Sequence, residues 1–168
     1  MSKEDTDVCI QQLGTDQFHW FDAADHDWDT VMDHFDDHEA QHEYIVVDAG
    51  GPYAEIMKEV SPDRTFEVAR FLKKYDDNFL WLFVDNVGVS YFLKNMEDVA
   101  MQAEDAFAGV CDSPEDWAYS FHEECGFLQE VPDNLRMYID WEAVARDAGQ
   151  DGILFIEYEG EIVVFYNF

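Results

Sequence analysis

Apolar residues recur along the chain at two spacings, which predict a mixture of helices and strands. Two stretches carry the i, i+3, i+4, i+7 spacing of an amphipathic helix. The first stretch has apolar residues at Trp28, Val31, Met32 and Phe35, and the second at Met96, Val99, Ala100, Ala103 and Phe107. Ser113-Pro114 predicts the start of a third helix, because Ser is a favourable N-cap and Pro suits the first helical position. The apolar stripe of that helix is Trp117, Phe121 and Cys125.

Strands are predicted near both ends of the chain. The candidate strands are residues 8–13, 18–21, 44–49, 153–158 and 161–165. Gly14-Thr15-Asp16 joins the first two strands, and Glu159-Gly160 joins the last two. Both joins are short enough to be hairpin turns, and the second forms the clearest hairpin of the sequence.

Between these ends the pattern is mainly helical. Residues 66–75 have helical periodicity, whereas the apolar run at 79–84 cannot be assigned by period alone. Another helix is predicted to open at Pro132-Asp133 and to continue through Trp141. The sequence therefore favours an α+β fold of three small units. These are a β-sheet with a helix at 1–60, a helical unit at 61–100 and an α+β unit at 101–168.

Charge changes this picture more than any motif does. The chain has 39 Asp+Glu against 9 Lys+Arg, a net charge of -30, which usually accompanies disorder. Here 48% of residues are hydrophobic and 16% are aromatic, so material for a core is ample. Two tracts hold acids and no base, with nine acids at 22–43 and eleven at 95–133. Both coincide with predicted helices, which suits binding to a basic groove such as those built for nucleic acid.

Most other classes of function find no support in the sequence. Nucleotide-binding glycine loops, zinc spacings and an apolar run long enough for a membrane span are all missing, and no cofactor is expected. Direct binding to nucleic acid or to a membrane surface is disfavoured, because both need Lys/Arg patches. Met1–Asp7 is polar and acidic, unlike a signal or transit peptide. Cys9, Cys111 and Cys125 are expected to be free thiols in a reducing cytoplasm.

A few residues could carry metal or acid–base chemistry. His34, His38 and His42 have i, i+4, i+8 spacing and could align on one side of a helix as metal ligands, although the same row fits a solvated helix face. Asp25, Asp27 and Asp29 fit a calcium loop poorly, because Thr30 occupies the position that requires Gly. Asp140 and Glu142 are a pair that so acidic a chain produces by chance. An enzyme is therefore not expected.

Adaptation to high salt would explain the negative charge without any binding role. Asp outnumbers Glu by 23 to 16, and Lys occurs only five times, as on halophilic surfaces. Against this stand 14 Phe, three Cys and the concentration of acids in base-free tracts. Salt adaptation and a binding role are compatible, so this alternative stays open.

The C-terminal third contains several short motifs that follow one another with a recognisable spacing. Ser113-Pro114-Glu115-Asp116-Trp117-Ala118 is followed by Cys125-Gly126-Phe127-Leu128, by a Pro-x-x-Leu-x-x-Tyr-Ile-Asp-Trp-Glu segment at 132–142 and by Ala145-Arg146-Asp147. Residues 104–147 thereby resemble the ArdA antirestriction family, with a looser resemblance at 18–22 and 42–48. The chain departs from the family pattern in its short start before Val8 and in its compressed middle.

This resemblance implies a noncatalytic DNA mimic. Such proteins are elongated, have three domains and pair through their C-terminal regions into a curved homodimer. They occupy the DNA-binding groove of type I restriction-modification enzymes, on the specificity and methyltransferase subunits, and protect incoming plasmid or phage DNA.

Within that reading, the phosphate-mimicking acids are expected to be Asp98, Glu104, Asp105, Asp112, Glu115, Asp116, Glu123 and Glu124, extended by Asp25, Asp27, Asp29, Asp33, Asp36 and Asp37. Tyr138, Ile139 and Trp141 are assigned to packing or dimerisation. The alternative function is an acidic chaperone or sequestering module for other basic DNA-binding proteins.

Overall fold

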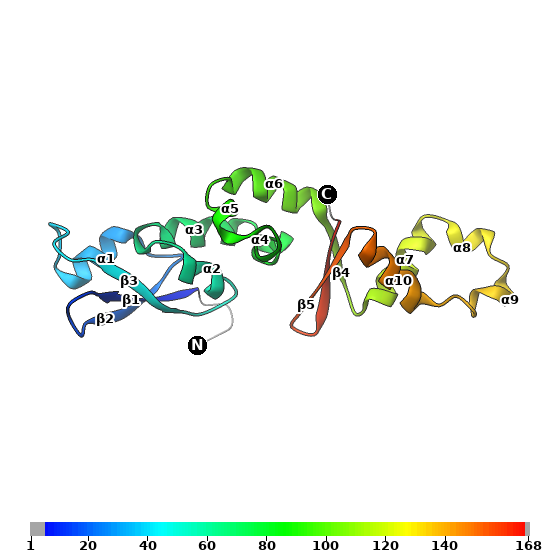
Figure 1. The fold of residues 1–168 in the computed structure, drawn as a ribbon, viewed down its shortest axis with the longest axis horizontal. Helices are drawn as coiled ribbons and strands as arrows, with labels where there is room; N and C mark the ends of the chain where they lie inside the picture. The colour runs from blue at the N-terminus through cyan, green and yellow to red at the C-terminus, as the bar shows by residue number, and fades with distance from the viewer. Residues whose placement is uncertain (1–5, 167–168) are drawn as a thin grey trace. The chain divides into compact units, whose positions relative to one another are not determined.

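The structure is a computed structural model that describes residues 6–166 and has an α+β fold (Figure 1). The fold class predicted from the sequence is therefore confirmed. The chain forms two compact units, Met1–Ala100 and Met101–Phe168. The division into three units stays a prediction.

The first unit is built on a three-stranded antiparallel sheet. Its strands β1 (Asp7–Gln12), β2 (Phe18–Asp22) and β3 (Tyr44–Ala49) lie in the order β2-β1-β3. The predicted first hairpin and third strand are thus confirmed. The backbone continues the pairing beyond the strands, because Leu13 N–H donates to the Glu43 carbonyl at 2.8 Å. This bond holds the hairpin turn against the segment that enters β3.

Within residues 6–166, helices pack on one face of this sheet, and the other face carries exposed apolar side chains. Helices α1 (Trp28–Phe35), α2 (Ala54–Glu59) and α3 (Pro62–Lys74) gather on one face, as Figure 1 shows for α1 and α3. That face buries Val8, Ile10 and Phe21, with Ile10 fully enclosed. Cross-strand partners share a face, so Phe18 and Ile45, which both pair with Gln11, lie on the opposite one. Both are exposed there.

The rest of the first unit is helical. It comprises the 3₁₀ turn η1 (Asp76–Asn78) and helices α4 (Leu80–Val87), α5 (Val89–Phe92) and the start of α6 (Met96–Ala106). The apolar run that period alone could not assign is α4, and its residues 80–84 are all buried. A helix buried on nearly every side shows no polar face, which explains the missing period.

The second unit contains another three-stranded antiparallel sheet. Strands β4 (Phe107–Cys111), β5 (Ile153–Tyr158) and β6 (Glu161–Tyr166) lie in the order β4-β6-β5. The predicted hairpin is confirmed, and its turn residues Glu159 and Gly160 both have positive φ, at 54° and 91°. Two positive φ values are typical of the type I′ turn that suits a two-residue hairpin. Phe107 pairs with Phe165 in this sheet, so its placement on the preceding helix was wrong.

Four helices complete the second unit within the part of the chain described. They are α7 (Pro114–Glu124), α8 (Phe127–Glu130), α9 (Asp133–Arg136) and α10 (Trp141–Gln150). Ser113 caps α7 as predicted, accepting the Asp116 N–H at 3.1 Å. Cys125 is exposed instead of buried, and Ala118 takes the buried position of α7.

The single helix expected from Pro132 to Trp141 was wrong. Helix α9 stops at Arg136, and α10 begins anew because the Asp140 carboxylate accepts the Ala143 N–H at 3.0 Å as an N-cap. Over residues 6–166, no helix is both long and apolar enough to cross a membrane.

Candidate acidic binding surface

Helix α1 presents the first group of candidate acids. Val31, Met32 and Phe35 are buried, so the remaining faces of the helix carry Asp29 and Asp33 outward. Asp27 is the N-cap, and its Oδ1 accepts the Thr30 N–H at 2.9 Å and the Thr30 hydroxyl at 2.8 Å. These hydrogen bonds, the backbone one foremost, lower the pKa of Asp27. Asp27 therefore both caps the helix and adds a fixed negative charge at its start.

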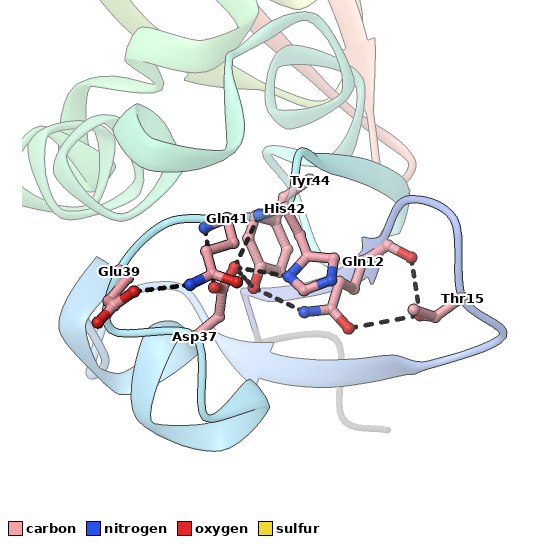
Figure 2. A network of polar contacts seen from close by, with 7 residues as sticks. All are labelled: Gln12, Thr15, Asp37, Glu39, Gln41, His42 and Tyr44. Carbon is pink, nitrogen blue, oxygen red and sulfur yellow. Dashed lines mark hydrogen bonds and ion pairs between the residues drawn. The ribbon is translucent and has the colours of Figure 1, made fainter.

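Asp37 differs from its neighbours because it is buried, with 5% of its surface exposed. Its carboxylate accepts the Gln41 N–H at 2.9 Å, the His42 N–H at 3.1 Å and the Tyr44 hydroxyl at 2.8 Å (Figure 2). Burial alone would raise the pKa of Asp37, but these bonds outweigh it and lower the pKa to about 2. Asp37 is consequently a structural anchor and is not available as an outward phosphate mimic.

The network around Asp37 extends to β1. Gln12 donates from Nε2 to the Tyr44 hydroxyl at 3.1 Å, and the Thr15 hydroxyl donates to the Gln12 carbonyl at 3.0 Å (Figure 2). Tyr44 thus links the loop after α1 to the first hairpin. Burial, followed by the contact with the Asp37 carboxylate, raises the pKa of Tyr44.

The histidine row does not form a metal site. Helix α1 ends at Phe35, and Asp36 takes a left-handed conformation with φ 50°, so the i, i+4, i+8 spacing does not continue on one helix. His34 stacks on His19 with ring centroids 3.9 Å apart, while His38 contacts Asp33 and His42 contacts Asp37. Across residues 6–166 no group of three His, Cys, Asp or Glu could hold a metal ion.

Helices α6 and α7 present the second group of acids. Ala103, Ala106 and Ala118 turn inward, and neither helix contains Lys or Arg. Glu115 is half-buried, whereas the other acids assigned to this group are exposed. The exposed members are Asp98, Glu104, Asp105, Asp112, Asp116, Glu123 and Glu124. Asp116 also accepts the Ser113 hydroxyl at 2.8 Å, which reinforces the cap of α7.

Most of the candidate acids have no cation beside them within residues 6–166, although the charge of Arg70 contributes, after the hydrogen bonds from Thr30, to the lowered pKa of Asp27. Among the residues described, none of them forms an ion pair with Lys or Arg; the ion pairs with those bases involve Glu55, Asp133 and Asp147. In the same part of the chain, the ion pairs of Asp33, Asp36 and Asp37 at the end of α1 are all with histidines. Exposed like charges on rigid helices repel one another at a cost in stability, which an oppositely charged partner would relieve.

The three residues assigned to packing or dimerisation lie in different environments. Trp141 packs edge-on against Tyr119 at 5.4 Å and near His122, inside its own unit. Ile139 is half-buried. Tyr138 is 77% exposed next to Met137, which is 78% exposed, so Tyr138 has no packing role within its unit. Contiguous exposed apolar surface marks interaction sites, so this pair is a candidate for part of an interface.

The thiols of Cys9 and Cys111 and the pair Asp140 and Glu142 are explained by their local structure. Burial raises the pKa of the Cys9 and Cys111 thiols, and nearby Asp48 and Asp116 raise it further. A raised pKa leaves little thiolate at neutral pH, so neither is an activated nucleophile. Asp140 is the N-cap of α10, and Glu142 lies in the first turn of that helix.

One feature was not anticipated from the sequence. An open pocket of about 360 Å³ in the first unit is lined by Leu13, Trp28, His42, Glu43, Tyr44, Ile45, Pro62 and Asp63. The apolar pattern placed Trp28 in a helix stripe and Tyr44 at the start of a strand, but no local pattern indicates that they meet. Their rings lie 5.4 Å apart and almost perpendicular.

Comparison with known proteins covers both groups of acids. A family model described as "Antirestriction protein (ArdA)" matches residues 13–161, which is most of the chain. No match to a curated protein was found. The match extends upstream of the C-terminal motifs and includes both groups of acids.

Proposed function

The chain belongs to the ArdA antirestriction protein family, and from this premise we propose that it is a noncatalytic DNA mimic. It occupies the DNA-binding groove of a type I restriction-modification enzyme, on the specificity and methyltransferase subunits. By doing so in the cytoplasm, it protects incoming plasmid or phage DNA. Members of this family are generally noncatalytic, and occupation of a groove requires no bond to be made or broken.

The observation that carries this proposal is the uncompensated, helix-borne charge. The acids of α6 and α7 stand on regular helices that contain no base, and most of them are exposed. Glu97/Asp98 and Glu104/Asp105 recur seven residues apart, or roughly 10 Å along a helix. Duplex DNA carries one negative charge per about 1.7 Å of its axis, so a groove tuned to DNA gains from a rigid carboxylate array.

A homodimer formed through the second unit is part of this proposal. Tyr138 and Met137 provide an exposed apolar pair, and Leu135 and Phe127 nearby in sequence are 48% and 45% exposed. A self-complementary apolar patch is what a two-fold interface needs. The acids would stay outside such an interface, because burying uncompensated carboxylates is costly.

The proposal is tested by competition for the enzyme. Fluorescent duplex DNA bound to a type I methyltransferase complex is titrated with the protein, and release of the DNA is followed by anisotropy. We expect stoichiometric displacement by the wild-type chain. The variant Asp98→Asn, Glu104→Gln, Asp105→Asn, Asp112→Asn should displace DNA at least about tenfold less effectively, since each lost charge removes a screened but additive contact.

A matched control removes the same charges elsewhere. Asp16→Asn, Glu67→Gln, Asp77→Asn and Asp151→Asn change exposed acids outside both tracts and should weaken displacement much less. If the two variants behave alike, general negative charge and not a shaped surface causes inhibition. If generic basic DNA-binding proteins are displaced from DNA as efficiently as the restriction enzyme, the sequestering-module alternative is correct.

A further inference from the structure

The pocket of the first unit combines three kinds of lining. Trp28 and Tyr44 provide aromatic surfaces that meet nearly at right angles. Leu13, Ile45 and Pro62 provide aliphatic surface, whereas Glu43 and Asp63 bring two exposed carboxylates. These residues come from four places: the turn after β1, the start of α1, the entry to β3 and the first turn of α3. The pocket therefore exists only in the folded unit.

Polar contacts hold two residues of the lining, Tyr44 and His42, in place. The Tyr44 hydroxyl donates to Asp37 at 2.8 Å and accepts from Gln12 at 3.1 Å, so the ring is tethered through its hydroxyl (Figure 2). His42 is tethered to the same Asp37 carboxylate at 3.2 Å from Nδ1. A buried carboxylate that fixes two lining residues makes this a preorganised site, which lowers the entropy lost on binding.

The chemistry of the lining selects a planar cation. Within the described residues, neither Glu43 nor Asp63 pairs with Lys or Arg, so their charges are available to a ligand. Aromatic faces attract cations, and a guanidinium group both stacks on rings and binds carboxylates through two parallel hydrogen bonds. An ammonium group has no plane to stack and holds its water more strongly. A metal ion fits poorly, since more than half of the lining residues are aliphatic or aromatic.

We propose that this pocket receives an arginine side chain of the partner protein and anchors the first unit on it. The inference rests on the proposed function, because a groove built for DNA is rich in arginine. A second copy of this chain is a poor donor, since each copy carries a net charge of -30 and only four arginines.

The surroundings of the pocket suit an anchor residue. Ile45 belongs both to the pocket lining and to the open sheet face, where Phe18 is 62% and Trp20 39% exposed. An anchor side chain contributes most when neighbouring apolar contacts exclude water from it. The open sheet face next to the pocket provides such contacts.

The direct test uses a capped arginine as a probe. N-acetyl-arginine methylamide is titrated into the full chain, and the indole resonance of Trp28 and the amide resonances of residues 43–45 are followed by NMR. We expect saturable shifts confined to the pocket, with weaker shifts from the lysine analogue and none from the norleucine analogue. Equal shifts at acids across the whole chain, or equal binding of norleucine, would overturn the inference.

Two variants separate the contributions of charge and ring. Glu43→Gln/Asp63→Asn should weaken arginine binding by about tenfold or more, as expected for lost bonds between charged groups. Trp28→Leu keeps apolar bulk and should remove the preference for arginine over lysine. The matched control Asp16→Asn/Glu67→Gln loses the same two charges from exposed positions of the first unit and should leave probe binding unchanged.

The same variants then enter the enzyme competition. Glu43→Gln/Asp63→Asn should dissociate from the restriction enzyme about tenfold faster, whereas the control should mainly lower the association rate. If wild-type protein never displaces DNA, the proposed function fails, and the probe titration still decides what the pocket binds. If wild-type protein displaces DNA and the pocket variant behaves like the control, the anchor is wrong and the proposed function stands.

Discussion

Replacing Tyr44 by Phe isolates the polar network that supports both the loop after α1 and the pocket. The substitution keeps the ring and removes only the hydroxyl, which donates to Asp37 at 2.8 Å and accepts from Gln12 at 3.1 Å. A hydrogen bond to a charged group contributes about 1.5–3 kcal/mol and a neutral one about 1 kcal/mol, both net of the exchange with water. We therefore expect Tyr44→Phe to lower the free energy of unfolding by about 3 kcal/mol at pH 7.

The effect should depend on pH in a defined direction. The pKa of Asp37 is about 2 in the folded chain and 3.8 without its partners, so its stabilising contribution is present above pH 4 and is lost as the pH falls toward 2. Removing one donor raises the folded pKa of Asp37. The stability difference between wild type and Tyr44→Phe should accordingly be full at pH 7 and shrink between pH 4 and pH 2.

Urea unfolding followed by circular dichroism at pH 7, pH 5 and pH 3 measures this difference. Tyr119→Phe is the matched control, because its hydroxyl makes only a long 3.4 Å contact with exposed Glu123. Its effect should stay below about 0.5 kcal/mol at each pH. A Tyr44→Phe effect that is constant over this pH range would mean that packing, and not the Asp37 carboxylate, is responsible, and the argument for a preorganised pocket would be refuted.

Three other perturbations address separate parts of the molecule. Ser113→Ala removes the cap of α7 and should cost about 1 kcal/mol in urea unfolding, while Ser113→Gly should cost only a few tenths. Tyr138→Asp introduces a charge at a 77% exposed position and should shift the protein toward monomer in analytical ultracentrifugation. The unfolding curve of a dilute sample should not change. If the variant is still a dimer, Tyr138 is not part of the interface. Raising NaCl from 50 to 200 mM should weaken binding to the restriction enzyme strongly for wild type, as measured by titration calorimetry. The effect should be smaller for the variant that lacks the charges of Asp98, Glu104, Asp105 and Asp112. Equal salt dependence of the two proteins would exclude these acids from the contact.

Much of the secondary structure could be predicted because its causes are local. The period of apolar residues located α1, the cap at Ser113-Pro114 located the start of α7, and Glu159-Gly160 located the last hairpin. The placement of Phe107 was wrong for a reason that is not local. Phe107 continues the helical spacing of α6, yet pairing with Phe165 of β6 places it in a strand, and such pairing joins residues distant in sequence.

The candidate site was predictable only in outline. Base-free acid tracts on helices can be seen in the chain itself, and most of their members are exposed in the structure. Asp37 belongs to the same run as Asp33 and Asp36, and no neighbouring residue marks it as different. It is buried because Gln41, His42 and Tyr44 fold back over it and satisfy its oxygens.

The sequence by itself determined the α+β character, the charge of -30, the capped acidic helices and the resemblance to one family. All of these depend on residue types or on spacings of a few positions, which local sterics and hydrogen bonding translate directly into structure. The tertiary structure alone decided that the histidine row ends in a loop, that Tyr138 is exposed and that Trp28, Tyr44 and Asp63 line one pocket. These outcomes depend on contacts between segments distant along the chain, which form only when the core of each unit closes.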